Sequence, residues 1–226
     1  MNILSAGAAK GLLHTIAARE AIELTGEFGA VGAMRERLKA GAPCDVIVLT
    51  AAMISELAAS GEAHAASVVA LGSVDTGVAR LNGAPTTELN SVVSLRRLLT
   101  EATRLYFPDP AKATAGMHVI KVLTALGLAA SHRERFATFA NGATAMRAMA
   151  DAGDDGSVGI TQRSEILYTE GVQYVGALPR PHALATVYCA AMMQDARDAA
   201  AATRLLTALA DARYVSVRRD AGFAVG

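Results

Sequence analysis

Five short stretches of small residues stand where an apolar strand pattern ends and a helical pattern begins. They are SAGA at 5–8, GAVGA at 29–33, LTAA at 49–52, TAG at 114–116 and NGA at 141–143. The N-terminus of a helix presents unpaired N–H groups and the positive end of its dipole, and small side chains let an anion approach the backbone. Capping preference alone supplies such residues at any single turn. Their recurrence at five turns predicts an anion site.

We expect the ligand contacts to come from these turns and from the end of one further strand. The predicted contacts are Gly7, Ala8, Ala30, Val31, Gly32, Thr50, Thr114, Ala115, Gly116, Asn141, Gly142, Gln162 and Arg163. Arg163 is the predicted charge partner, because a guanidinium fork with an adjacent amide suits a planar carboxylate. The alternative for Arg163 is a solvated side chain in the first turn of a helix. Thr114 is expected to donate its hydroxyl to the anion, to cap its helix, or both.

Three residues would carry proton transfer if the protein is an enzyme. His118 lies one turn into its helix, near enough to the predicted anion to exchange a proton. Lys10 and His14 are four residues apart and share a helix face. Packing or solvent exposure is the alternative for each of them. The standard catalytic and metal-binding signatures, such as HExxH, CxxC, GxSxG and the P-loop, are missing, so we expect neither a metal nor a cofactor.

Composition limits the possible partners. The 226 residues include 21 Lys and Arg and 21 Asp and Glu, with no basic block, so nucleic acid is not an expected partner. No apolar run reaches the roughly 18 residues that cross a bilayer, so we expect no membrane insertion. A cytoplasmic protein is expected if Met1 is native, and a periplasmic one if a signal peptide was removed. Cys44 and Cys189 are too few for a disulfide framework and are read as reduced core thiols.

Strand and helix patterns alternate along the chain, which favours an α/β fold with mainly parallel sheets. The expected strands are 2–5, 21–28, 44–49, 104–107, 136–141, 157–161 and 172–176, and the expected helices are 8–19, 31–40, 51–60, 91–102, a helix opening at 114, 143–152, 163–168 and 195–209.

Two long β-rich segments interrupt this rhythm. Residues 66–82 contain two apolar runs with no helix between them, and ALATVYCAAMM at 183–193 is a second long run. Both suit strands that cross between lobes, so we expect lobe I at 1–76 plus 184–226, lobe II at 77–183 and a ligand cleft between them. Asp75 and Thr76 lie in the first crossing, where we expect them to tie the hinge together rather than to touch the ligand.

Several stretches carry a resemblance to a known family. They are MNILSAGAAKG, FGAVGAMRERLKAGAPCDVIVLTA, VDTGVARLNGAP, DPAKATAGMHVIKVL, GIT, and GVQYVGALP before TVYCAAM. Over essentially its whole length the chain resembles type II periplasmic substrate-binding proteins of the molybdate-binding family. The resemblance implies a two-lobe type II fold with a double crossover hinge, a small anionic ligand, and delivery of that ligand to the membrane permease of an ABC transporter.

The chain departs from the family pattern at the positions that hold molybdate. Molybdate binders carry serines in the first two turns, where this chain has Ala8, Ala30 and Val31, and they carry a tyrosine where it has Gln162. The chain is therefore similar to a divergent branch of the family that includes aconitate isomerase. We expect a protein that binds a small carboxylate or oxyanion; the alternatives are an isomerase of a small polycarboxylate and a cytoplasmic ligand sensor.

Overall fold

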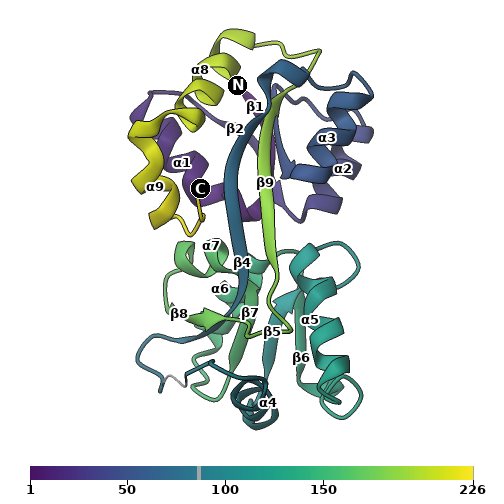
Figure 1. Cartoon of the computed structure of the whole chain (residues 1–226), viewed down its shortest axis with the longest axis vertical. Coiled ribbons are helices and arrows are strands. Elements are labelled where there is room, and N and C mark those ends of the chain that lie inside the picture. Colours follow the sequence, from purple (N-terminus) through teal and green to yellow (C-terminus); the bar gives the residue numbers. More distant parts are fainter. Residues whose placement is uncertain (86–87, 226) are drawn as a thin grey trace. The chain divides into compact units, whose positions relative to one another are not determined.

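The chain folds as two compact units. The computed structural model describes residues 1–85 and 88–225, and it divides the chain into unit 1, Met1–Val74 with Thr186–Gly226, and unit 2, Asp75–Ala185. Two strands, β4 (Val69–Leu81) and β9 (Ala185–Met192), contain the points where the chain passes from one unit to the other. Each unit has a sheet flanked by helices (Figure 1), which confirms the predicted α/β fold class.

The sheet of unit 1 contains three neighbouring parallel strands. Strand β1 (Asn2–Ala6) lies between β2 (Thr25–Gly29) and β3 (Val46–Thr50), and β9 pairs antiparallel with β3. The chain moves outward from β1 to β2 and then returns past β1 to β3. This reversal places the two connecting helices on opposite faces of the sheet, and ligands of open α/β sheets typically bind at the carboxyl ends of the strands beside such a reversal.

Helices cover both faces of the unit 1 sheet. They are η1 (Gly7–Ala9), α1 (Lys10–Arg19), α2 (Val31–Lys39), α3 (Ala51–Ala59), η2 (Ala65–Ser67), α8 (Ala199–Ala210), η4 (Ala212–Tyr214) and α9 (Val215–Asp220). Helices α1, α8 and α9 gather on one side of the sheet, and α2 and α3 lie on the other (Figure 1).

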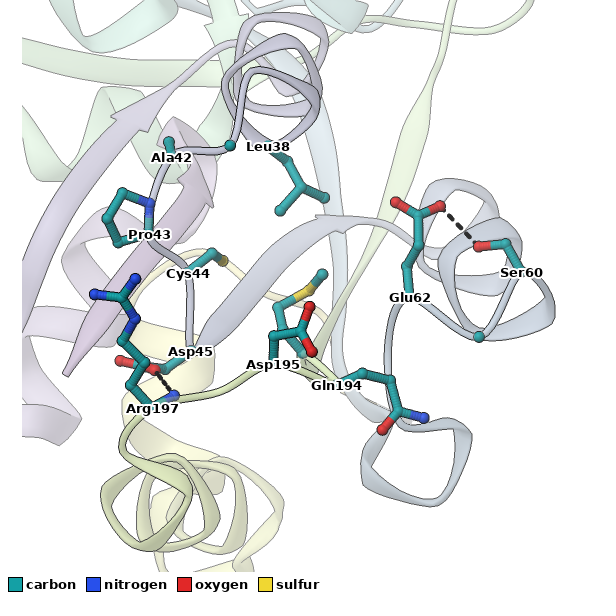
Figure 2. A pocket seen from close by; sticks show the side chains of 13 residues that line it. Leu38, Ala42, Pro43, Cys44, Asp45, Ser60, Glu62, Gln194, Asp195 and Arg197 are labelled. Carbon is teal, nitrogen blue, oxygen red and sulfur yellow. Dashed lines mark hydrogen bonds between the residues drawn. The ribbon is translucent and has the colours of Figure 1, made fainter.

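The amino ends of β1 and β3 are tied together by one carboxylate. Asp45, 1% exposed, accepts hydrogen bonds from the amides of Asn2 and Arg197, each over 2.6 Å, and from the amide of Asp198 over 3.2 Å. Burial alone would raise the pKa of Asp45, but these amides outweigh burial and lower it. Asp45 and Arg197 line a pocket of about 530 Å³ (Figure 2). This pocket lies at the end of the strands opposite to the predicted anion turns.

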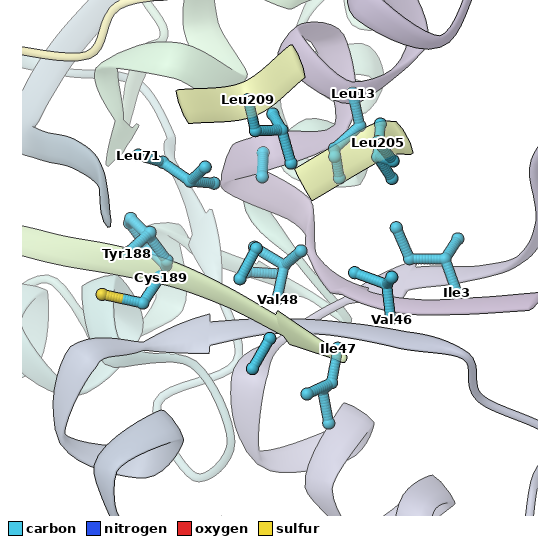
Figure 3. Packing of buried hydrophobic residues seen from close by; sticks show 14 of the residues in the cluster. Ile3, Leu13, Val46, Ile47, Val48, Leu71, Tyr188, Cys189, Leu205 and Leu209 are labelled. Atoms are coloured by element: carbon cyan, nitrogen blue, oxygen red, sulfur yellow. The ribbon is translucent and has the colours of Figure 1, made fainter. Parts of the chain in front are cut away.

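The core of unit 1 follows from the alternation of side chains along its strands. In β3, Val46 and Val48 face the side where Leu205 and Leu209 pack, whereas Ile47 points to the opposite face (Figure 3). All five side chains are fully buried. A strand that is apolar on both faces needs a helix layer on each, which explains why CDVIVL is a continuous apolar run.

Unit 2 repeats the strand order of unit 1. Strand β5 (Leu105–Pro108) lies between β6 (Phe136–Phe139) and β7 (Val158–Gln162), and all three are parallel. Strand β4 pairs antiparallel with β7 and with β8 (Val172–Ala177). The chain moves outward from β5 to β6 and returns to β7, so the strand order reverses between β5 and β7 as it does between β1 and β3.

The helices of unit 2 form two small cores. The helices are α4 (Val92–Glu101), α5 (Thr114–Ala125), η3 (Arg133–Arg135), α6 (Gly142–Ala152) and α7 (Arg163–Tyr168). One core joins α4 and α5 to one face of the sheet through residues such as Leu99, Phe107 and Val119. The other core joins α6 and α7 to the opposite face through Met146 and Ile166.

Two expected boundaries are wrong, for local reasons. The strand expected at 21–28 begins only at Thr25, because the amide of Ile22 donates to the carbonyl of Ala17 and Ala21 has a φ of 50°, which closes α1. The helix expected from Asp195 begins at Ala199, because the side chain of Asp198 accepts from the amide of Ala201 and caps the helix there.

Candidate functional site

Three predicted anion turns meet at one edge of the unit 1 sheet. The parallel register pairs Ala6 of β1 with Gly29 of β2 and Ser5 of β1 with Val48 of β3. A helix begins directly after β1 at Gly7 and directly after β3 at Ala51, and α2 begins one residue after β2, at Val31. None of these first turns contains an acidic residue. The edge therefore carries three helix N-termini with their positive ends side by side.

The three turns differ in how their amides are capped. No side chain caps η1 or α2, where Ala8 and Ala30 are almost buried and Gly7 and Gly32 are partly exposed. In contrast, the hydroxyl oxygen of Thr50 accepts a hydrogen bond from the amide of Met53 over 3.4 Å. The Thr50 hydroxyl therefore already serves as a helix cap, whereas the turn at Ala30, Val31 and Gly32 leaves its amides uncapped by side chains.

The turn before α5 has a different cap from the one expected. Thr114 is the first helical residue, and the N-cap position belongs to Ala113, whose side chain has no oxygen. The prediction that Thr114 caps this helix is therefore wrong. The side chain of Thr114 is partly exposed, and no side chain caps the N-terminus of α5. Gly116 has a packing role, because a Cβ there would lie 2.2 Å from the carbonyl oxygen of Pro108. Ala115 is buried beside it.

The turn at Asn141 and Gly142 is already occupied by a carboxyl group of the protein itself. The buried carboxylate of Glu165 accepts from the Thr161 hydroxyl over 2.6 Å and from the backbone amides of Gly142 and Ala143. Burial raises the pKa of Glu165, and these hydrogen bonds lower it only in part. Asn141 caps α6 through its Oδ1, which accepts from the amide of Thr144 over 2.9 Å. The backbone amides of this turn, which we expected to contact the ligand, therefore bind Glu165 instead.

Arg163 follows β7 directly and has an unusual environment. Its guanidinium carbon lies 5.2 Å from the ring centroid of Tyr174 in β8. Its Nε is buried and has no hydrogen-bond partner in the described part of the chain. A buried donor without a partner costs about 1–3 kcal/mol, so a ligand that accepts from this N–H would relieve a real penalty. Gln162, the N-cap residue of α7, is 3% exposed.

Sequence reasoning missed or undervalued three residues near Arg163. The sequence did not identify Tyr174 or Glu165 as site residues, because both act through contacts that no local sequence pattern predicts. Thr76 was assigned to the hinge, yet it is fully buried, pairs in register with Gln162, and its hydroxyl has no hydrogen-bond partner among the described residues. A buried hydroxyl beside a predicted ligand residue is the signal that would have drawn attention to Thr76.

The candidate proton-transfer residues lie in different units. In unit 1, Lys10 and His14 share a helix face as expected, and both contact the ring of Phe28. The Nζ atom of Lys10 lies 5.8 Å from the centroid of that ring, and the ring centroid of His14 lies 5.0 Å from it. Burial and the nearby Lys10 charge lower the pKa of His14. In unit 2, His118 Nε2 lies 2.7 Å from the carbonyl oxygen of His182. Since a carbonyl oxygen only accepts, this contact fixes the proton on Nε2 and leaves Nδ1 as the acceptor.

Other chemistry finds little support in the side chains. Within residues 1–85 and 88–225 no group of three or more His, Cys, Asp or Glu side chains could hold a metal ion. None of the helices described is long and apolar enough to cross a membrane. Both cysteines are free thiols, and burial raises the pKa of Cys44 to about 12.

Two α/β units that share two long strands, each with helix N-termini at the carboxyl ends of its parallel strands, define a two-lobe type II solute-binding fold. The sequence matches the family of bacterial extracellular solute-binding proteins over residues 2–224, so the chain belongs to this family.

Individual proteins of known activity or structure are also similar to this chain. It is 24% identical to aconitate isomerase from Pseudomonas sp. over 231 residues, covering 98% of this chain and 86% of that protein. The periplasmic molybdate-binding protein of Azotobacter vinelandii has the same fold, with a TM-score of 0.77 and 18% identity over 100% of this chain and 99% of that one. A sulfate-binding protein of Mycobacterium tuberculosis superposes with a TM-score of 0.71 and 16% identity over 99% and 85% of the two chains.

Proposed function

We propose that this solute-binding protein binds a small anion, a carboxylate or an oxyanion, through strand-end turns of both units. The observation that carries the proposal is the pair of uncapped helix N-termini, α2 in unit 1 and α5 in unit 2. Neither helix has a side-chain cap or an acidic residue in its first turn. Amides that no side chain satisfies, at the positive end of a helix dipole, favour a negatively charged partner.

Arg163 is the cationic contact in this proposal. Arg163 directly follows β7, where the strand order reverses between β5 and β7, and its buried Nε has no hydrogen-bond partner in the described part of the chain. The ligand contacts proposed in unit 1 are the turns at Gly7 and Ala8 and at Ala30 to Gly32. In unit 2 they are Thr114 and Ala115 with Gln162 and Arg163. Asn141 and Gly142 position Glu165 instead of touching the ligand.

The relatives give the proposal its ligand classes. Proteins of the same fold bind molybdate and sulfate, which are tetrahedral oxyanions, and the curated relative acts on a polycarboxylate. The family also supports a role in transport. We propose that the protein works in the periplasm, closes over its ligand by hinge motion at the two crossing strands, and passes the anion to a membrane permease.

A thermal-shift screen tests the proposed function. The purified chain is heated with molybdate, tungstate, sulfate, phosphate, citrate and succinate, with sodium chloride at equal ionic strength as the control for charge screening. A ligand at about 100 times its Kd stabilises the folded state by about 2.7 kcal/mol, which raises the midpoint by several degrees. If no anion raises the midpoint above the chloride control, the proposed function is wrong.

A second candidate, an isomerase of a small polycarboxylate, is favoured by the match to aconitate isomerase along 98% of the chain. In this account Arg163 binds a carboxylate, and His118 moves a proton through its Nδ1, with Lys10 and His14 as the alternative bases. Incubation with cis- or trans-aconitate, followed by ultraviolet absorbance of the conjugated double bond, tests it directly.

The matched variants are His118→Asn and His132→Asn. His132 is partly exposed in the same unit, where its Nδ1 contacts the Ser131 hydroxyl, so its replacement should leave any isomerisation unchanged. Conversion that disappears only in His118→Asn supports the enzyme. A flat absorbance trace with both aconitate isomers excludes that substrate.

A further inference from the structure

We infer that Tyr174 determines ligand specificity: it holds Arg163 by a cation–π contact, which leaves the guanidinium N–H groups available to a planar carboxylate of the ligand. This inference rests on the proposed anion-binding function. It adds a residue that the sequence did not single out and a preference for carboxylates over tetrahedral oxyanions.

Arg163 lies against the face of an aromatic ring. The guanidinium carbon lies 5.2 Å from the ring centroid of Tyr174, a distance at which the electron-rich ring face attracts the charge. A ring face holds the charge without accepting any of the five N–H donors. The neighbouring carboxylate, Glu165, is committed to the Thr161 hydroxyl and to the amides at the start of α6. The buried Nε of Arg163 accordingly has no acceptor among the described residues.

Tyr174 is positioned by an irregularity in the pairing of β4 with β8. Strands β4 and β8 change register between Val78 and Ala79, and Tyr174 pairs with Ala79 at this irregularity. Gly77 leaves room for the ring, because a Cβ at that position would lie 2.4 Å from the Cε2 atom of Tyr174. Burial raises the pKa of the Tyr174 phenol, so the ring stays neutral beside the cation. The pairing of β4 with β8 and the absence of a side chain at Gly77 therefore position the Tyr174 ring that Arg163 contacts.

An oriented guanidinium group favours carboxylates over tetrahedral oxyanions. A carboxylate accepts two parallel hydrogen bonds from the planar guanidinium fork, which requires the fork to be held in one orientation. A tetrahedral oxyanion needs no such orientation, because amides at helix N-termini surround it from several directions. Removal of the ring should therefore weaken carboxylate binding and leave sulfate binding unchanged.

Calorimetric titration of the full chain with citrate, succinate, trans-aconitate and sulfate tests the inference. The variants are Tyr174→Phe, which keeps the ring, Tyr174→Leu, which removes it, and Arg163→Ala. The matched control is Tyr168→Leu, at the exposed far end of α7. We expect carboxylate affinity to fall about 3- to 30-fold in Tyr174→Leu, to stay within about 3-fold in Tyr174→Phe, and to be unchanged in the control. In the Arg163→Ala background, Tyr174→Leu should cause no further loss.

Tyrosine absorbance provides a second readout if Tyr174→Leu does not fold. Because the chain has no Trp, the near-ultraviolet spectrum reports its five tyrosines. Carboxylate binding should change this spectrum in the unaltered protein and not in Tyr174→Phe. An unchanged carboxylate affinity in Tyr174→Leu, an equal loss for sulfate, or identical spectral changes in both proteins would overturn the inference. Binding of sulfate without any carboxylate overturns the inference alone, whereas no binding of any anion overturns the proposed function with it.

Discussion

Gly142 and Glu165, which are 23 residues apart in the sequence, pack in direct contact with each other. The amide of Gly142 donates to the buried carboxylate of Glu165, and a Cβ on residue 142 would lie 2.0 Å from the Oε2 atom of that carboxylate. The start of α6 is thus closed by a buried carboxyl group that also contacts the amide of Gln162, the residue before Arg163. One buried side chain joins the turn after β6 to the turn after β7.

Replacement of Gly142 by alanine should destabilise the fold. The new methyl group would meet both the Glu165 carboxylate and the Thr161 hydroxyl oxygen, the latter at 1.9 Å. Overpacking of a buried site typically costs about 1–3 kcal/mol, measurable as a lower urea midpoint. The matched control is Gly176→Ala, whose Cβ would lie in ordinary contact, 3.7 Å from Leu89. Equal midpoints for the two variants would contradict the fit between Gly142 and Glu165.

Stability should depend on Glu165 in weakly acidic solution. Because burial raises the pKa of Glu165 above its ordinary value of 4.5, the folded state binds the proton more tightly than the unfolded state. The contribution of this carboxyl is therefore fully present below pH 4.5 and is lost as the pH rises through the folded pKa. The difference in unfolding free energy between the unaltered protein and Glu165→Gln should shrink from acid to neutral pH. A difference that grows with pH would show that the folded pKa is lowered.

Asp45 should show the opposite pH dependence. Its folded pKa lies below the ordinary value of 3.8, so its contribution is present above that value and is lost as the pH falls through the folded pKa. Asp45→Asn should lower the unfolding free energy at neutral pH by about 1–3 kcal/mol, because an amide group cannot satisfy all three amide donors. Asp195→Asn, an exposed carboxylate in the same pocket, is the control and should change little. Urea unfolding at neutral pH compares the two, and an equal effect would contradict the assignment.

The sequence predicted the repeated parts of the fold well, because they depend on local chemistry. Arg163 begins α7, as expected, and Gly41 follows the end of α2 with a positive φ of 80°. Parallel strands that end in small residues predicted the helix starts. The residues around Arg163 could not be predicted in this way. Tyr174 reaches it from a different strand through a register shift, and Glu165 reaches the start of α6 through the tertiary fold.

A negative charge at the start of α2 should separate stability from binding. Gly32→Asp places a carboxylate in the first turn, where it interacts favourably with the helix dipole by about 0.3–1 kcal/mol. The same charge would repel an anion at the adjacent amides, so anion affinity should fall at least about tenfold, or 1.4 kcal/mol. Val93→Asp at the exposed start of α4 is the control, with a similar effect on stability and none on binding. Unchanged anion affinity in Gly32→Asp would remove this turn from the site.

The central claim is that a small anion binds at the strand-end turns with Arg163 as its cationic contact. Isothermal titration of the purified chain and of Arg163→Ala with each anion of the panel tests this claim most directly. We predict saturable binding of at least one anion to the unaltered protein, and an affinity lower by about 10- to 100-fold in Arg163→Ala, as expected for loss of a charged hydrogen-bonding group. Equal affinities in the two proteins, or no binding by any anion, would contradict the account.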